Sequence, residues 1–152
     1  MSDPIVFNTA TPRLSLPLLF AAQAQKELFH NEALARIDAL LHAAVEGTAS
    51  APPAVPQDGE SWLISAPATG LWTGQEDAIA TFQNGGWLFT QPLMGLRILD
   101  KTAGQTAIFM SNWQKAVVVE EPSGGPNVDS QARAAIGALI SALRAAGIYP
   151  PA

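Results

Sequence analysis

Histidine and cysteine, the residue types most often found at metal and nucleophilic centres, are scarce in this sequence. The two histidines, His30 and His42, stand twelve residues apart, whereas a helical metal pair needs a separation of three or four residues. Each is therefore interpreted as a polar helix residue. The chain contains no cysteine, which excludes disulfides and thiolate metal sites. We predict that the protein has no metal centre.

Four carboxylates lie in turn-like stretches and are interpreted as solvated loop charges: Asp58, Glu60, Glu76 and Asp77. A glycosidase needs two carboxylates held across a cleft, and nothing in the sequence indicates such a pair. The serines lack a G-x-S-x-G setting, and the glycines near positions 85 and 124 lack the context of a phosphate cradle. We predict that the protein is not an enzyme and binds no cofactor. The weaker alternative is a polysaccharide hydrolase, which would require a carboxylate pair in one cleft.

Tryptophan is the one residue type here that offers a binding chemistry, because sugar rings stack on exposed aromatic faces. The four copies are Trp62, Trp72, Trp87 and Trp113. Packing in the core or at its rim is the favoured interpretation for residues on such short strands. Trp72 stands between Gly70 and Gly74, in a loop expected to bury little, and is predicted to be the most exposed. Trp72 and Trp113 are therefore the candidate glycan contacts.

Composition narrows the class of partner. Only 14% of the 152 residues are charged and 48% are hydrophobic, so a core can form and partners are expected to cover part of the surface. The eight basic residues are spread along a chain of net charge −5, whereas a phosphate-binding face needs them clustered. We therefore expect no nucleic acid partner.

The chain is expected to be made and folded in the cytoplasm, without insertion into a membrane. Residues 1–4 lack the basic and apolar regions of a signal peptide. The longest apolar stretch, Leu16 to Ala22, is interrupted by Pro17 and is too short to span a bilayer.

The elements that would position these side chains begin with an extended arm over residues 1–17, which contains three prolines. Its apolar side chains need a surface, either on their own domain or on a neighbouring subunit. Residues 18–47 are predicted to form a helical segment that ends at Gly47, with an apolar face built by a 3-4-3 spacing. That face comprises Leu34, Ile37, Leu41 and Ala44. Asn31 is a candidate cap for a second helical segment within it.

Residues 57–120 are predicted to form a small antiparallel β-region of hairpins. Asn84-Gly85 is typical of a tight hairpin turn. The expected strands include Trp62–Ile64, Ala78–Phe82, Trp87–Phe89, Leu96–Leu99, Thr106–Met110 and Ala116–Val119.

A flexible linker over residues 122–126 leads to a C-terminal helix over residues 127–149. Asp129 or Ser130 is its predicted cap, and Gly147 its left-handed stop. Its apolar stripe consists of Ile136, Leu139, Ile140 and Leu143, and packs either on its own core or on another subunit. The predicted fold class is therefore α+β, with helices on both sides of a mostly antiparallel region.

Several short motifs between residues 11 and 90 are shared with a known family. They include Thr11-Pro12-Arg13-Leu14, the runs Q-A-Q-K-E from Gln23 and H-N-E-A-L from His30, Asp38-Ala39-Leu40, Gly70-Leu71-Trp72 and Gly85-Gly86-Trp87. The chain resembles a family of phage, prophage and gene-transfer-agent virion proteins, associated with tail fibres and head spikes and long catalogued only as a domain of unknown function.

This resemblance implies a structural protein at the surface of a phage-like particle. The chain has no long shaft and no large receptor-binding domain, so we expect a base or adaptor that attaches a spike or fibre, at the head or on a tail. Its partners would be a capsid or tail protein and a fibre or spike protein, with host polysaccharide contacted indirectly. Copies would form a ring, five-fold at a capsid vertex or three-fold on a fibre.

The candidate subunit and partner contacts are Ile5, Phe7, Leu14, Gln23, Gln25, Lys26, His30, Asn31, Glu32, Ile136, Leu139 and Leu143. For the polar members, the alternative is that they brace the helix within one chain. A carbohydrate-binding module that recognises host surface polysaccharide is the competing function. It predicts an exposed Trp72 or Trp113 among polar side chains.

Overall fold

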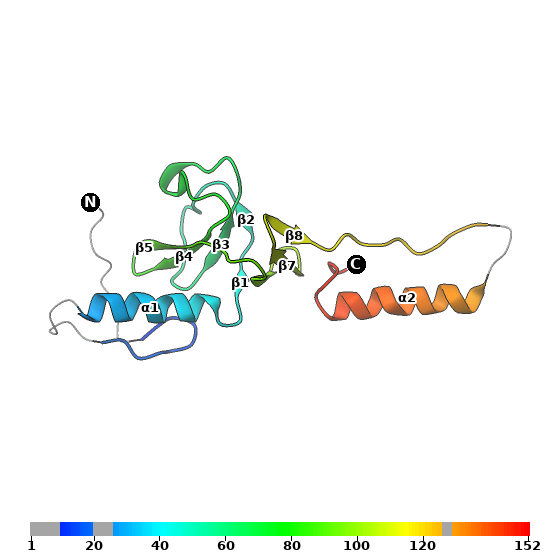
Figure 1. Ribbon diagram of the computed structural model, residues 1–152, viewed down its shortest axis with the longest axis horizontal. Helices are drawn as coiled ribbons and strands as arrows, with labels where there is room; N and C mark the ends of the chain where they lie inside the picture. The colour runs from blue at the N-terminus through cyan, green and yellow to red at the C-terminus, as the bar shows by residue number, and fades with distance from the viewer. Residues whose placement is uncertain (1–9, 20–25, 126–128) are drawn as a thin grey trace.

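The computed structural model describes residues 10–19, 26–125 and 129–152. Four of the candidate contacts lie outside the described residues: Ile5, Phe7, Gln23 and Gln25. For a fifth, Lys26, the backbone is described but the side chain is not. The fold is α+β, as the sequence predicts. Two helices flank a β-body, and the molecule is elongated, with one helix along the body and the other beyond it (Figure 1).

In the part of the chain that the structure describes, eight short strands form two four-stranded sheets. The first has the order β1-β6-β7-β8 and the second the order β2-β3-β4-β5. The strands are β1 (Ala44–Val45), β2 (Thr48–Ala49), β3 (Ser61–Ile64), β4 (Ile79–Gln83), β5 (Gly86–Thr90), β6 (Arg97–Asp100), β7 (Gln105–Phe109) and β8 (Trp113–Lys115).

Each sheet carries one parallel edge strand, which corrects the prediction of an antiparallel region beginning at residue 57. β1 pairs in parallel with β6, and β2 pairs in parallel with β3. Strands of two residues are too short to produce an alternating pattern, so the sequence gives no signal for them. The other strand pairs are antiparallel. Asn84 and Gly85 join β4 to β5 and have φ of 49° and 77°, which confirms the predicted hairpin turn.

Helix α1 (Lys26–Leu40) is shorter than the predicted segment of residues 18–47. Leu18 and Leu19 are not helical, and the chain turns after Leu40 into β1. His42 has a φ of 54° at this turn, and Val45 enters the core as a strand residue. Tertiary burial of Val45 therefore overrides the helix propensity of the preceding residues.

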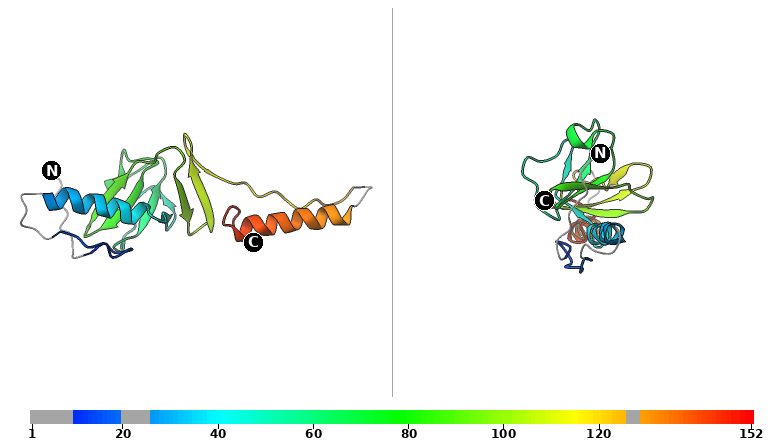
Figure 2. Two further views of the ribbon diagram at one scale, coloured as in Figure 1. Left: turned by 60° about the horizontal axis from the view of Figure 1, so that its bottom comes forward. Right: turned by 90° about the vertical axis from the view of Figure 1, so that its left-hand side faces the viewer.

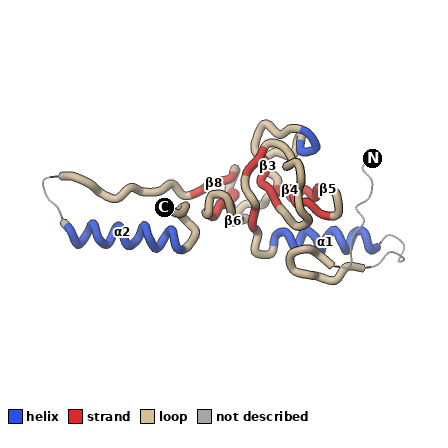
Figure 3. Tube along the Cα trace, turned by 180° about the vertical axis from the view of Figure 1, so that it is seen from behind, coloured by secondary structure: helices blue, strands red, loops and turns tan. Residues whose placement is uncertain are grey.

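The buried face of α1 also differs from the predicted stripe. Ile37 and Leu41 are half exposed, whereas Ala35, Asp38 and Ala39 are buried. The 3-4-3 spacing identified a helix but placed its apolar face wrongly, because residues 10–19 lie against the polar face and bond to it (Figure 3).

Two clusters of buried side chains form the core. One lies between the sheets and contains Val45, Leu63, Ile79, Ile98 and Ala107. The other lies under the loop that joins β3 to β4 and contains Ile64, Ala68, Trp72, Ala78 and Ala80. The short 3-10 helix Gly70–Trp72 in that loop inserts Trp72 into this second cluster.

Helix α2 (Ser130–Ala145) projects away from the sheets, and residues 116–125 run beside it (Figures 1 and 2). Asp129 caps it by accepting hydrogen bonds from the N–H groups of Gln131 and Ala132. Gly147, with a φ of 66°, ends it, and Ile148 donates back to Leu143. These features confirm the predicted caps. The predicted strand Ala116–Val119 is wrong, because sheet pairing ends at Lys115.

Candidate assembly surface and ligand groove

Asn31 braces the chain internally. Its side chain accepts from the N–H of Leu19 and donates to the C=O of Leu19, both at 2.9 Å, and it is buried. The neighbouring Glu32 forms an ion pair with Arg36, whose guanidinium also donates to the backbone of Phe89 on β5 at 2.9 Å. For Asn31 and Glu32 the intrachain interpretation therefore holds. Within the H-N-E run of α1, only His30 is left exposed.

A second brace centres on Asp38, which sequence reasoning did not identify as an anchor. Its carboxylate accepts from the hydroxyl of Thr11 at 2.8 Å and from the N–H groups of Arg13 and Leu14 at 3.1 and 2.6 Å. The Arg13 side chain donates to the carbonyls of Asp38, Ala39 and His42. Arg13 thus satisfies carbonyls at the end of α1 that have no helical partner. The signal was present in the shared motifs, which contain Thr11, Arg13 and Asp38.

The predicted stripe on α2 divides between a buried and an exposed part. Ile140 is buried, whereas Leu139 is 64% exposed and Ile136 is at the margin of exposure. Leu139 belongs to a row with 3-4-3-4 spacing whose members are all exposed: Ala132, Ala135, Leu139, Ala142 and Ala146. This spacing is the one by which helices pack side by side in bundles.

The segment of residues 116–125, called the linker from here on, is hydrogen-bonded to α2 and carries exposed apolar side chains. Arg133 of α2 donates to the carbonyls of Pro122 and Gly124. Val117 is 85% exposed, and Val119 is also exposed. The projecting part of the molecule therefore presents apolar side chains from both the helix and the linker.

Further exposed apolar side chains lie on the body, away from α2. On α1, Phe29 is 77% exposed and Ile37 is half exposed, as is Leu41 directly after the helix. The loop between β5 and β6 adds Leu93 and Met94, each more than 70% exposed. Leu14 of the brace segment is also marginally exposed. Where such side chains gather into one patch, they are typical of contacts with other proteins.

Trp72 is not a surface residue, so the prediction that it contacts glycan is wrong. It is fully buried, and its ring meets that of Trp87 edge-on at a centroid distance of 5.0 Å. The glycines around it, at φ of 62° for Gly70 and 78° for Gly74, allow the loop to fold over the sheet. Glu76 closes the loop by accepting from the N–H of Ala68 at 3.1 Å, and its own N–H and that of Ala68 lower the pKa of its carboxyl.

Trp113, the other candidate, borders an open groove of about 490 Å³ where the two sheets meet. The indole N–H donates to the C=O of Asp77 at 2.9 Å, and the ring meets that of Phe109 at a centroid distance of 5.3 Å. The groove is lined by Thr48, Leu63, Ile64, Ser65, Ala66, Asp77, Asn112, Trp113 and Lys115. Polar and aromatic groups therefore converge here.

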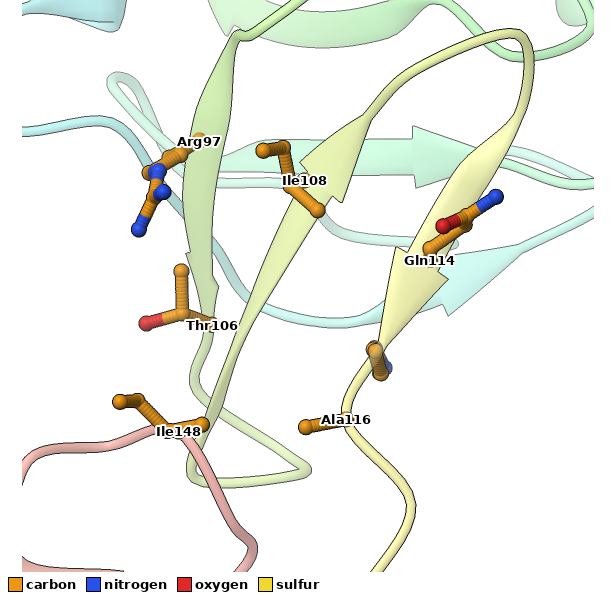
Figure 4. A pocket seen from close by; sticks show the side chains of 7 residues that line it. Arg97, Thr106, Ile108, Gln114, Ala116 and Ile148 are labelled. Carbon is orange, nitrogen blue, oxygen red and sulfur yellow. The ribbon is translucent and has the colours of Figure 1, made fainter. Parts of the chain in front are cut away.

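A second groove, of about 320 Å³, lies on the outer face of β6, β7 and β8 (Figure 4). It is lined by Arg97, Thr106, Ile108, Gln114, Lys115, Ala116 and Ile148. The turn after α2 forms one wall, because the C=O of Gly147 accepts from the N–H of Thr106 at 2.6 Å. This contact anchors the base of the projecting helix to the body.

Lys115 on β8 lines both grooves and forms an ion pair with Asp100, whose carboxyl is almost fully buried. Burial opposes ionisation of Asp100. The hydrogen bond and charge of Lys115 and the N–H groups of Ala103 and Thr102 outweigh it and lower the pKa of this carboxyl.

The described residues contain neither a metal-binding cluster nor a helix suited to a membrane. No group of three or more His, Asp or Glu side chains there is arranged to hold a metal ion. Neither α1 nor α2 has the length and continuous apolar sequence that a bilayer span requires.

Comparison with known proteins identifies a family but not an activity. A family model described as a protein of unknown function, DUF2793, matches residues 30–114. These residues extend from α1 to β8 and leave out the linker and α2. No curated protein and no solved structure matches the chain. Because the matched residues make up more than half of the sequence, the chain belongs to this family.

Proposed function

We propose that the protein is a structural, non-enzymatic adaptor that attaches a spike or fibre to a phage-like particle, such as a gene transfer agent. In this proposal it resides at the particle surface, at the head, with a tail-fibre position as the close variant. Copies associate into a ring, five-fold at a capsid vertex or three-fold on a fibre. One surface of the ring contacts a capsid or tail protein, and the other contacts the spike or fibre.

The observation that carries this proposal is the apolar row on α2, on a helix that stands away from the body. A helix of 16 residues whose alanines and Leu139 are exposed to water is only marginally stable by itself. Association with the same row of another copy would bury these side chains and supply the missing packing. The row and its linker lie outside the family region of residues 30–114. We therefore assign self-association to α2.

The body would then be free to contact the other partner. Phe29 and Ile37 lie on α1, which runs along the β-body, whereas α2 projects beyond the body (Figure 2). Leu41, Leu93 and Met94 add exposed apolar side chains outside α2. Two separate apolar surfaces suit a protein that joins two others, because each can be buried without blocking the second.

Light scattering of the purified chain tests the self-association. We expect a mass that is a whole-number multiple of the chain mass. Leu139→Glu should reduce this mass to that of one chain, because a carboxylate in an apolar helix seam would be buried without a partner. Ser141→Glu, exposed on the same helix but outside the row, is the matched control and should leave the mass unchanged.

Two outcomes would contradict the proposal. One is a native chain that stays monomeric up to high protein concentration. The other is an assembly that Leu139→Glu leaves intact, which would move the subunit contact away from α2. In the assembly on the particle, Phe29→Glu should instead lose the second partner while the mass of the isolated ring is unchanged.

A further inference from the structure

We propose that the groove beside Trp113 binds one neutral pyranose ring of a glycan. This binding site is separate from the assembly surfaces on α2 and α1. Residues from both sheets line it, and they include the aromatic Trp113 together with the polar residues Thr48, Ser65, Asp77, Asn112 and Lys115. The volume of about 490 Å³ lies within the roughly 300–1,000 Å³ of small-molecule sites.

The backbone fixes the position of two of these groups. Asp77 has a left-handed φ of 64°. Its N–H donates to Ile64 at 3.0 Å, and its C=O accepts from the Trp113 indole at 2.9 Å. An aspartate in this region of φ is uncommon and is maintained only where neighbours hold it. Asp77 and Trp113 are therefore held together at the groove, and Asp77 is an exposed residue.

The remaining polar side chains have hydrogen-bonding capacity to spare. Among the described residues, the carboxylate of Asp77 and the hydroxyl of Ser65 take part in no side-chain hydrogen bond. Asn112 uses its amide oxygen to accept from Gln114, which leaves its NH₂ group free. The groove therefore offers both acceptors and donors, and vicinal hydroxyls of a sugar can satisfy both at once.

Other ligand classes fit this groove less well. A phosphate would meet the Asp77 carboxylate, and the charge of Lys115 is already neutralised by Asp100. A divalent cation would find no cluster of three acidic or histidine side chains in the described chain. A wholly apolar ligand would leave the polar groups of Asp77, Ser65 and Asn112 unpaired. A sugar ring avoids each of these costs, since its C–H face can rest on Trp113 while its hydroxyls meet the polar groups.

The test uses the full-length protein with an array of neutral bacterial surface oligosaccharides, followed by saturation-transfer NMR on any that bind. We expect at least one to bind and to transfer saturation from Trp113. Asp77→Gly should weaken that binding about ten-fold or more, because a charged acceptor of hydroxyl groups is removed. Glycine adopts the left-handed φ at this position without strain, so the fold is retained.

Asn84→Gly is the control, since it also replaces a polar residue with a left-handed φ by glycine, at the opposite end of β4. It should leave binding unchanged. Trp113→Phe keeps an aromatic ring at the rim and should weaken binding less than Asp77→Gly. An array without a bound oligosaccharide, or binding that Asp77→Gly leaves intact, would overturn the assignment. The mass of the Asp77→Gly assembly separates this result from a failure of the adaptor proposal, because α2 is untouched.

Discussion

The hydroxyl of Thr11 donates a hydrogen bond to the carboxylate of Asp38 at 2.8 Å, and both residues are buried. They are 27 residues apart in sequence, so this bond ties the segment before α1 to its last turn. The same carboxylate oxygen accepts from the N–H of Leu14 at 2.6 Å. Asp38 therefore helps to order residues 10–19, an irregular stretch in which Ala10 and Pro17 form an isolated β-bridge.

Asp38→Ala should destabilise the folded chain by about 3 kcal/mol, measured as the free energy of unfolding in urea. The substitution leaves the hydroxyl of Thr11 and the N–H groups of Arg13 and Leu14 without an acceptor. Asp38→Asn keeps one acceptor oxygen and should have a smaller effect. Glu32→Gln changes a half-exposed carboxylate on the same helix and should cost about 0.5 kcal/mol or less. Equal effects of Asp38→Ala and Glu32→Gln would show that the brace contributes nothing.

The hydrogen bonds of Asp38 show which features of α1 the sequence could not predict. Helix formers without Gly or Pro identified the helix, but its ends and its buried face depend on residues 10–19. Arg13 bonds to the carbonyls of Asp38, Ala39 and His42, and such a long-range cap leaves no local pattern. Apolar spacing alone selected Ile37 as buried, whereas a hydrogen-bonded Asp38 is buried instead.

Trp72→Phe should change the free energy of unfolding by less than about 1 kcal/mol, whereas Trp72→Ala should cost about 3–5 kcal/mol. Alanine leaves a cavity in the cluster under the β3–β4 loop. Phenylalanine keeps most of the packing against Trp87, and it removes an indole N–H that is buried without a partner among the described residues. Thermal and urea unfolding of both variants measure the difference. If Trp72→Phe lowers the free energy of unfolding as much as Trp72→Ala, the Trp72 indole N–H must have a hydrogen-bond partner that stabilises the fold.

Trp72 also shows why local glycines misled the prediction. Glycine on both sides suggested an open loop, but a positive φ at Gly70 and Gly74 is what lets the chain fold back over the sheet. The hairpin turn at Asn84-Gly85 and the caps of α2 were predictable, because each depends on residues adjacent in sequence. Burial of Trp72 depends instead on its packing against residues of β4 and β5. The pairing of these strands is not visible in the residues next to Trp72.

Asp100→Asn should lower stability at neutral pH by roughly 1–3 kcal/mol, because Lys115 loses a buried charged partner. The folded state lowers the pKa of Asp100 below its ordinary value of 3.8. Its carboxylate therefore stabilises the fold fully above that value, and this contribution is lost as the pH falls through the lower folded-state pKa. Urea unfolding at pH 7 and at pH 3 should show the difference between native chain and variant shrinking at the acid end.

Glu120→Gln is the control for this pH dependence. Glu120 is exposed on the linker, and its neutralisation should change stability by no more than about 0.5 kcal/mol at either pH. A difference between the native chain and Asp100→Asn that stays constant from pH 7 to pH 3 would mean that the ion pair with Lys115 does not favour the ionised carboxyl.

Asn31→Ala should cost about 1–3 kcal/mol of stability, whereas His30→Ala should stay within about 0.5 kcal/mol. The two residues are neighbours on α1, yet Asn31 bonds to both backbone groups of Leu19 and His30 is exposed. Hydrogen exchange at the amide of Leu19 should accelerate in Asn31→Ala only. Light scattering of both variants completes the comparison. A smaller assembly for His30→Ala with unchanged stability would place this end of α1 in a subunit contact, and self-association would then not be confined to α2.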